Sequence, residues 1–172
     1  MRAPRPRLVL DTNLLVPGVA GATGIPPGRS ASASLIRAWD AGYCTLVVSE
    51  PLLAEYEEVM QRPPFCIAPR DAAGLRRIIA QRAVVVLPRQ SRLLLTRDPD
   101  DDVVLKTAVT GKADLLVTNN VADFREIATL PGGTSNLSYR GVRVVGLGAC
   151  LAEIRAAHAG AERTMRRQRR WP

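Results

Sequence analysis

Four separated stretches of this sequence carry side-chain oxygens of the kind that hold hard metal ions or act on phosphate groups. Each stretch follows or borders an apolar run, so the chain can bring the four together in space. Hard cations such as Mg²⁺ and Mn²⁺ prefer oxygen donors, and the set needs no histidine or cysteine. The candidate residues are Asp11, Glu55, Asp101, Asp102, Thr118, Asn120 and Asp123. Their types predict metal-dependent chemistry on a phosphate.

Asp11 and Glu55 come from the first half of the chain. Asp11 directly follows the apolar run Leu8-Val9-Leu10, where a carboxylate can reach a metal in the crevice beyond a strand. The same position suits a turn former or a helix cap, so Asp11 alone decides nothing. Glu55 stands three residues after Leu52 and one before Tyr56, at the border of an apolar helical stripe. That border predicts a side chain that can point into a cleft.

The run from Arg97 to Asp102 holds four acids within five residues. Carboxylates at a helix start are stabilised by the helix dipole, which accounts for one or two of them. Four would repel one another unless cations neutralise them, so the run favours a metal site. A second polar group, Thr118 and Asn120 with Asp123 behind them, follows the apolar run 115–117. Their oxygens extend the predicted donor set.

The elements that must position these residues alternate between strands and helices. Short apolar runs predict strands at 8–10, 43–48, 83–87, 114–118 and 141–145, and helical spacing predicts helices over 30–41, 50–61, 71–82, 101–111 and 147–159. The glycines and prolines between 18 and 28 predict a long loop after Asn13. This order predicts an α/β fold, a three-layer α/β/α sandwich around a mostly parallel sheet. Ligands of such sheets bind beyond the carboxyl ends of the strands.

Length and composition place the chain among ordinary globular proteins. Its 172 residues, 47% hydrophobic and 23% charged, suit a single domain over 1–160 followed by a flexible basic tail over 161–172. The three cysteines form no Cys-x-x-Cys pair, so neither a zinc site nor a disulfide framework is indicated. No segment reads as a signal peptide or a membrane span. We therefore expect a cytoplasmic protein in a reducing compartment.

The net charge of +8 is unevenly distributed along the sequence. Segment 62–92 holds seven arginines against Asp71 alone, and the tail over 161–172 holds five against Glu162. The remainder is net acidic. Basic segments around acidic ones suit an enzyme that attracts a polyanion with arginine and handles it at metal-loaded carboxylates, although a solvated charged surface has the same composition.

Taken together, the motifs of this chain resemble the PIN-domain family, and most nearly the toxins of type II toxin-antitoxin pairs. No single motif is specific, but their order and spacing are, and they cover most of the chain. The motifs are Leu10-Asp11-Thr12-Asn13, the segment from Ser49 to Glu55, the segment from Arg97 to Asp102, Val117-Thr118-Asn119-Asn120, and Asp123-Phe124.

The resemblance implies a role for each matching residue. Asp102 is taken as the third acidic ligand because it lies sixteen residues before Thr118, and Asp101 is its nearest competitor. Many family members have Asp where this chain has Asn120, which leaves the occupancy of a second metal open. The implied metal ligands are Asp11, Glu55, Asp102 and Asn120, with Asn13 orienting Asp11, Asp101 in support, Thr118 offering a hydroxyl to metal or phosphate, and Asp123 as a further donor.

The function implied by the resemblance is an Mg²⁺- or Mn²⁺-dependent endoribonuclease that cuts single-stranded or structured RNA. Metal-activated water would attack the phosphodiester in line and leave 5′-phosphate and 3′-hydroxyl ends. The implied partners are a cognate antitoxin and a second copy of the chain, with no membrane. Two alternatives stay open within the fold, namely RNA maturation and a catalytically weakened module that binds RNA or an antitoxin.

Two other kinds of chemistry are disfavoured. Phosphotransfer of the dehalogenase type also begins with a strand followed by Asp, but it normally needs a second Asp where this chain has Asn13. The only histidine, His158, lies in the C-terminal predicted helix without a nucleophile pattern nearby, which argues against Ser-His-Asp or Cys-His catalysis.

Overall fold

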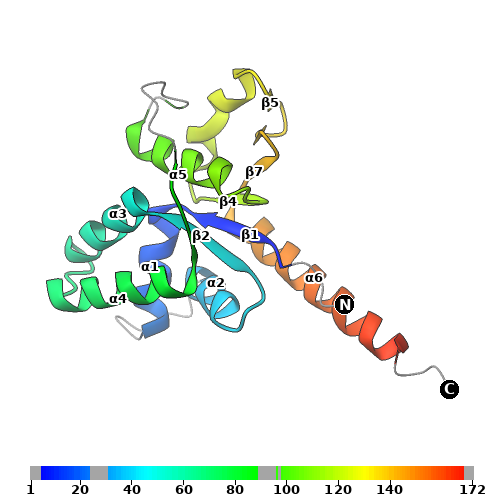
Figure 1. The fold of residues 1–172 in the computed structure, drawn as a ribbon, viewed down its shortest axis with the longest axis horizontal. Coiled ribbons are helices and arrows are strands. Elements are labelled where there is room, and N and C mark those ends of the chain that lie inside the picture. Colours follow the sequence, from blue (N-terminus) through cyan, green and yellow to red (C-terminus); the bar gives the residue numbers. More distant parts are fainter. Residues whose placement is uncertain (1–4, 24–30, 89–95, 97, 169–172) are drawn as a thin grey trace.

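The fold of this chain is an alternation of strands and helices, seen in a computed structural model that describes residues 5–23, 31–88, 96 and 98–168 (Figure 1). The elements, in chain order, are β1 (Arg7–Leu10), α1 (Thr12–Thr23), α2 (Ala31–Asp40), β2 (Thr45–Ser49), α3 (Glu50–Gln61), α4 (Pro69–Arg82), β3 (Val84–Val86), α5 (Pro99–Thr110), β4 (Leu115–Val117), the 3-10 helix η1 (Val121–Thr129), β5 (Gly133–Thr134), β6 (Ser138–Tyr139), β7 (Val142–Val145) and α6 (Leu147–Gln168). The predicted α/β class is confirmed.

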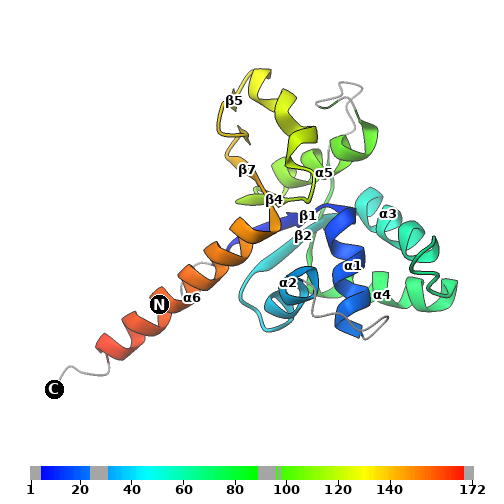
Figure 2. The same ribbon diagram turned by 180° about the vertical axis from the view of Figure 1, so that it is seen from behind.

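A seven-stranded sheet of order β3-β2-β1-β4-β7-β6-β5 forms the middle layer. The first five strands in that order pair in parallel, whereas β6 and β5 are antiparallel additions at one edge. The central strands are buried on both faces, as their unbroken apolar sequences require. Figure 1 and Figure 2 show the sheet from opposite sides, with α4 nearer the viewer in the first and α1, α2 and α6 nearer in the second.

Helix α3 begins where the sequence predicts, and its start is fixed by local chemistry. The Ser49 hydroxyl caps the helix by accepting a hydrogen bond from the Leu52 amide at 3.4 Å, and Pro51 occupies the first turn. The buried face of the helix is made by Leu52, Leu53, Tyr56 and Met60. This face packs α3 against the sheet and holds Glu55 at the border of the core.

Residues 12–23 form a helix, so the prediction of a loop after Asn13 was wrong for this segment. The glycines and Pro17 disfavour a helix locally, but burial of the apolar residues around them outweighs that preference. Gly18 permits the close approach of α2, because a Cβ atom there would lie 2.8 Å from Ile36 Cγ1 and 2.9 Å from the Ser32 carbonyl oxygen. Tertiary packing therefore decides this element. The remainder of the predicted loop, residues 24–30, lies outside the described residues.

Two further boundaries differ from the sequence prediction. Helix α6 was expected to end at Gly160, yet it continues to Gln168 and projects from the body of the molecule. Most of the predicted tail is thus helical, and residues 169–172 lie outside the described part of the chain. The short strands β5 and β6 were not predicted, because two-residue strands leave no alternating pattern.

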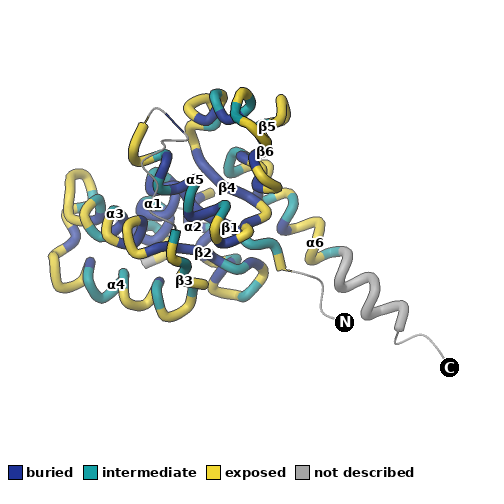
Figure 3. Tube along the Cα trace, turned by 45° about the horizontal axis from the view of Figure 1, so that its top comes forward, coloured by how far each residue is buried: buried dark blue, intermediate teal, exposed yellow. Residues whose placement is uncertain are grey.

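The core runs through the centre of the sheet and the helices that flank it. Figure 3 shows this distribution, with buried residues along β1, β2 and β4 and exposed residues on the outer faces of α3 and α4. Helix α5 packs over β1, β2 and β4. Within the described residues, no helix combines the length and the apolar character that crossing a membrane requires.

Candidate active site

The carboxyl ends of β1 and β4 lie side by side and bring Asp11 next to Thr118. Leu10 pairs with Val117 in the parallel register, and the Asp11 amide donates a hydrogen bond of 2.9 Å to the Val117 carbonyl. On the other side of β4, the Thr118 amide donates to the Val145 carbonyl at 3.1 Å. Residues 107 positions apart in sequence therefore share one edge of the sheet.

Asp11 is held in place by neighbouring polar groups. Its Oδ2 atom accepts hydrogen bonds from the Thr118 hydroxyl at 2.6 Å and from Asn13 Nδ2 at 2.7 Å, while Oδ1 has only a long contact of 3.4 Å with the Asn13 amide. Burial raises the pKa of Asp11, and the hydrogen bond from Thr118 opposes that shift. The protein thus holds Oδ2 by two hydrogen bonds, and backbone hydrogen bonds from Asn13 and Thr12 also stabilise the carboxylate.

Glu55 reaches the same region from α3. The Thr12 hydroxyl, in the first turn of α1, donates a short hydrogen bond to Glu55 Oε1. The Tyr56 hydroxyl donates another to the Leu10 carbonyl, which ties α3 to the end of β1. Burial is the main cause that raises the pKa of Glu55, and repulsion from Asp100, Asp11 and Asp98 adds to it. The glutamate therefore lies within the electrostatic reach of the other acids.

The third group of acids stands at the start of α5. Asp98 is the N-cap, and its Oδ1 atom accepts a hydrogen bond of 2.9 Å from the Asp100 amide. Pro99 follows at the first helical position, where its missing N–H costs nothing. Asp100, Asp101 and Asp102 follow in the first turn of the helix.

Asp101 and Asp102 have different surroundings. Burial, together with repulsion from Asp11, Asp98, Asp123 and Asp100, raises the pKa of Asp101 to about 6. Asp102 is 4% exposed, and its Oδ2 atom forms an ion pair of 2.6 Å with Lys106 Nζ one turn along the helix. The structure thus places Asp101 with the other acids, and it gives Asp102 a cation of its own.

Asp101 shares the electrostatic surroundings of Asp11 and Asp102 pairs with Lys106, and both remain candidates for the third acidic ligand. The sequence prediction preferred Asp102 from its spacing to Thr118, but one residue along a helix turns a side chain by about 100°. Spacing alone cannot resolve that difference. The ion pair with Lys106 also anchors Asp102 in the first turn of α5.

The residues after β4 complete this edge of the sheet. Thr118 is fully buried, and its hydroxyl also accepts a hydrogen bond of 3.0 Å from the Asn120 amide. Asn13 spans the two segments, since its Oδ1 atom accepts from the Asn119 amide at 3.3 Å. The side chains of Asn120 and Asp123 are exposed at the mouth of the site. Thr118 is consequently placed to orient Asp11 and not to reach solvent.

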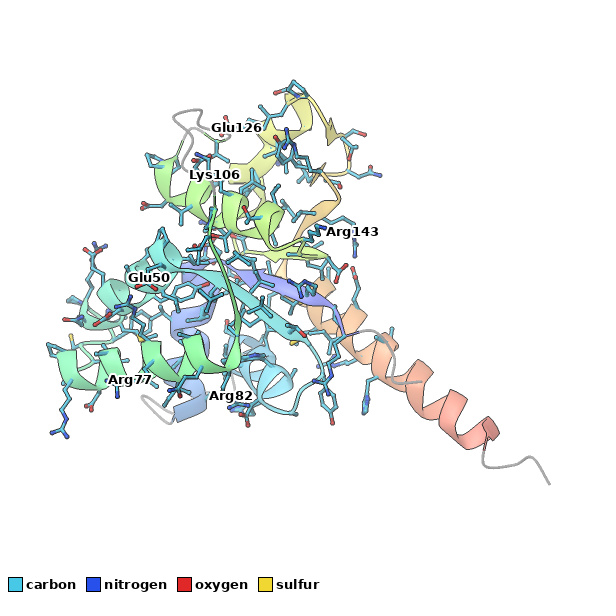
Figure 4. The ribbon with its side chains drawn as sticks, in the orientation of Figure 1. Glu50, Arg77, Arg82, Lys106, Glu126 and Arg143 are labelled. Atoms are coloured by element: carbon cyan, nitrogen blue, oxygen red, sulfur yellow. The ribbon has the colours of Figure 1, made fainter. Side chains whose placement is uncertain are left out.

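A cleft of about 740 Å³ opens between the start of α5 and η1. It is lined by Asp98, Asp101, Ala122, Asp123, Arg125, Glu126 and Thr129. Figure 4 labels residues from both sides of this region, with Lys106 on α5 and Glu126 on η1 in the upper part of the view. The volume falls within the range of roughly 300–1,000 Å³ that ligand pockets usually have.

The donor set of the site fits a hard divalent cation. Among the described residues, no three acidic, histidine or cysteine side chains converge closely enough to hold a metal ion. The donors are nevertheless oxygens, the ligand type that Mg²⁺ and Mn²⁺ prefer, and burial raises the pKa values of Asp11, Glu55 and Asp101. A divalent cation would relieve that repulsion.

Three supporting residues were not assigned a role from the sequence. Thr12 holds Glu55, Tyr56 holds the end of β1, and Arg125 lines the cleft. Thr12 and Tyr56 adjoin predicted site residues, but adjacency does not reveal a hydrogen bond between α1 and α3. Arg125 follows Asp123-Phe124 in a segment without a helical period, so nothing in the sequence separates it from a surface arginine.

Comparison with known proteins identifies a family and finds distant likenesses among solved structures. A family model described as PIN domain matches residues 7–122. The crystal structure of VapBC2 from Rickettsia felis bound to a DNA fragment from their promoter is similar, with 16% sequence identity, a TM-score of 0.48 and coverage of 81% of this chain and 98% of that chain. No curated protein sequence matches this chain.

Proposed function

Because this chain belongs to the PIN-domain family, we propose that the acidic edge of the sheet at Asp11, Glu55 and Asp101, with the cleft that Asp101 lines, is the active site of a metal-dependent endoribonuclease that hydrolyses single-stranded RNA. The observation that supports this most is the position of Asp11, which Thr118 and Asn13 hold at the edge of the sheet and which helps to raise the pKa of both Glu55 and Asp101. Carboxylates with raised pKa values that gather at one place are typical of functional sites, where a bound cation offsets their repulsion.

We assign a role to each site residue from its contacts. Asp11, Glu55 and Asp101 would hold Mg²⁺ or Mn²⁺, with Asn120 and Asp123 as candidates for a second ion. A divalent cation in such a site lowers the pKa of a water molecule and neutralises the charge that develops on the phosphate. Asn13 and Thr118 orient the Asp11 carboxylate, and Thr12 orients Glu55. These positioning residues keep the ligands in place between turnovers.

Cleavage of a mixed-sequence RNA tests this proposal. Purified full-length chain is incubated with labelled single-stranded RNA, or with DNA of the same sequence, in Mg²⁺, in Mn²⁺ and in EDTA. We expect cutting of RNA alone, in either metal, with 5′-phosphate and 3′-hydroxyl products, and no cutting by Asp11→Asn. Retention of RNA without cutting in any metal would instead favour a binding module, and Asn120→Asp would then be the variant expected to rescue cleavage.

We further propose that the ribonuclease is the toxin of a toxin-antitoxin pair, acts in the cytoplasm and works as a homodimer. The resemblance in motifs is what supports this role. Induced expression of the parent chain should arrest growth of a bacterial host, while equal amounts of Asp11→Asn should not. Co-expression of the cognate antitoxin should restore growth. Unimpaired growth with active enzyme would point to RNA maturation.

A further inference from the structure

Arg125 is the one basic residue among the described residues that line the cleft. The other lining side chains include four acids, Asp98, Asp101, Asp123 and Glu126. An arginine that lies among four acidic side chains is expected to form an ion pair with one of them. Arg62, Arg76, Arg82 and Arg143 each form such a pair elsewhere on the molecule. Arg125 forms none within the described part of the chain, and its side chain is exposed.

The backbone that carries Arg125 is firmly anchored. Phe124 and Ile127, on either side of it in η1, are both fully buried. Gly133 of β5 packs directly on η1, since a Cβ atom there would lie 1.8 Å from the Ile127 carbonyl oxygen. The base of the Arg125 side chain is therefore fixed at the cleft wall, while its guanidinium group remains available.

We propose that Arg125 binds a backbone phosphate of the RNA next to the one that is cut. This inference rests on the proposed function and adds a positioning residue to it. Asp11, Glu55 and Asp101 would hold the cation, and the guanidinium group would bind an RNA phosphate through paired N–H donors. A cleft with both kinds of charge can hold a polyanion despite its four carboxylates.

Arg125 could instead serve only to offset the acids of the cleft. The two roles predict different responses to Arg125→Gln. Removing a phosphate contact reduces the slope of log affinity against log salt concentration by about 0.7 for single-stranded nucleic acid. Removing a neutralising charge leaves that slope alone and tightens metal binding, because the carboxylates then lack a competing cation.

The test measures affinity for a fluorescent single-stranded RNA across a KCl series in Mg²⁺. Full-length chain carrying Asp11→Asn, which prevents cutting, is compared with and without Arg125→Gln. Arg140→Gln serves as the matched control, since Arg140 is also an exposed arginine but packs over the Tyr139 ring and does not line the cleft. Mn²⁺ affinity is measured in parallel with Asp11 intact.

We expect Arg125→Gln to weaken RNA binding several-fold at low salt and to flatten the slope by about 0.7, with Arg140→Gln unchanged. An unaltered slope together with tighter Mn²⁺ binding would overturn the phosphate role, as would equal effects of both variants. Such results leave the ribonuclease proposal intact if the parent chain cuts RNA. Failure of the Asp11→Asn chain to bind RNA, together with a parent chain that does not cut it, would overturn both.

Discussion

At the scale of single residues, the site depends on which carboxylate of a contiguous run faces the cleft. Asp101 shares the electrostatic environment of Asp11, and Asp102 pairs with Lys106. The presence of acids at this point could be predicted from sequence, because the run 98–102 exceeds what a helix dipole accounts for. The sequence could not predict which of the neighbours Asp101 and Asp102 faces the cleft, since that depends on the rotation of α5 about its axis.

Replacing these two acids should separate catalysis from stability. Asp101→Asn is expected to reduce RNA cleavage more than about 100-fold, the upper end of what outer-shell changes cost at metal sites. Asp102→Asn should lower the free energy of unfolding by roughly 1–3 kcal/mol, because it weakens a largely buried charged hydrogen bond to Lys106. The rate of RNA cleavage in saturating Mg²⁺ and the free energy of unfolding in urea are measured for both variants. Loss of cleavage in Asp102→Asn and loss of stability in Asp101→Asn would instead indicate that Asp102 is the metal ligand.

The raised pKa of Asp101 also predicts how stability depends on pH. The folded state holds this proton up to a pH of about 6, whereas an unfolded aspartate releases it near 3.8. The folded state therefore binds more protons between these values, and the free energy of unfolding falls as pH rises through that window. Asp101→Asn removes this dependence, so in EDTA the variant should gain stability relative to the parent as the pH rises from 3.8 to about 6.

Urea unfolding at several pH values in EDTA measures the effect. A stability difference between parent and variant that does not change with pH would contradict the raised pKa. Repeating the series in Mg²⁺ provides the control, because a bound cation keeps the carboxylate ionised and should reduce the pH dependence of the parent.

At the scale of elements, local sequence chemistry places most helices correctly, and packing decides the exceptions. Helix α3 has a capping serine, an early proline and a regular apolar face, so its bounds at Glu50 and Gln61 could be predicted. Helix α1 follows Asp11, which can cap it, but it contains Pro17 and Gly18, which disfavour a helix. It forms because its apolar residues are buried against the sheet and α2. A local sequence pattern does not reveal such packing between elements.

The contact of α1 with α2 gives a direct test of that explanation. Gly18→Ala should lower the free energy of unfolding by about 1–3 kcal/mol, because the added methyl group overlaps Ile36 and the Ser32 carbonyl. Gly74→Ala in α4 is the matched control, since nothing lies within 4 Å of a Cβ atom there. The control should gain about 0.5–1 kcal/mol through helix propensity. Stabilisation of both variants would show that α1 and α2 pack less closely.

At the scale of the whole molecule, the distribution of charged residues suits the binding of a polyanion. Acids gather at the carboxyl edge of the sheet, and basic residues occupy the 62–92 segment and the end of α6. Part of the 62–92 segment is already paired, since Arg76 contacts Glu50 and Glu57 and Arg82 contacts Asp40. Arg89 and Arg92 lie outside the described residues. The five arginines of segment 161–172 are thus the more promising contacts for RNA.

Removal of residues 161–172 should therefore weaken RNA affinity and flatten its dependence on salt. For every arginine that binds a phosphate, its removal should reduce the slope by about 0.7. The body of the molecule should keep its stability, because Cys150 and Ile154, the residues of α6 that are buried among those whose burial is described, lie before the cut. Fluorescence anisotropy across a salt series checks this prediction, with circular dichroism as the folding control. An unaltered slope would show that this segment does not contact RNA.

The measurement that tests the central claim most directly is the rate of RNA cleavage as Mg²⁺ is titrated into metal-free chain. The parent should show a rate that rises from zero and saturates, and Asp11→Asn should stay at the EDTA baseline at every concentration, since it removes the charge of a buried ligand without changing its size. A rate that persists without metal, or an Asp11→Asn curve that follows the parent, would contradict a metal-loaded carboxylate site at this edge of the sheet.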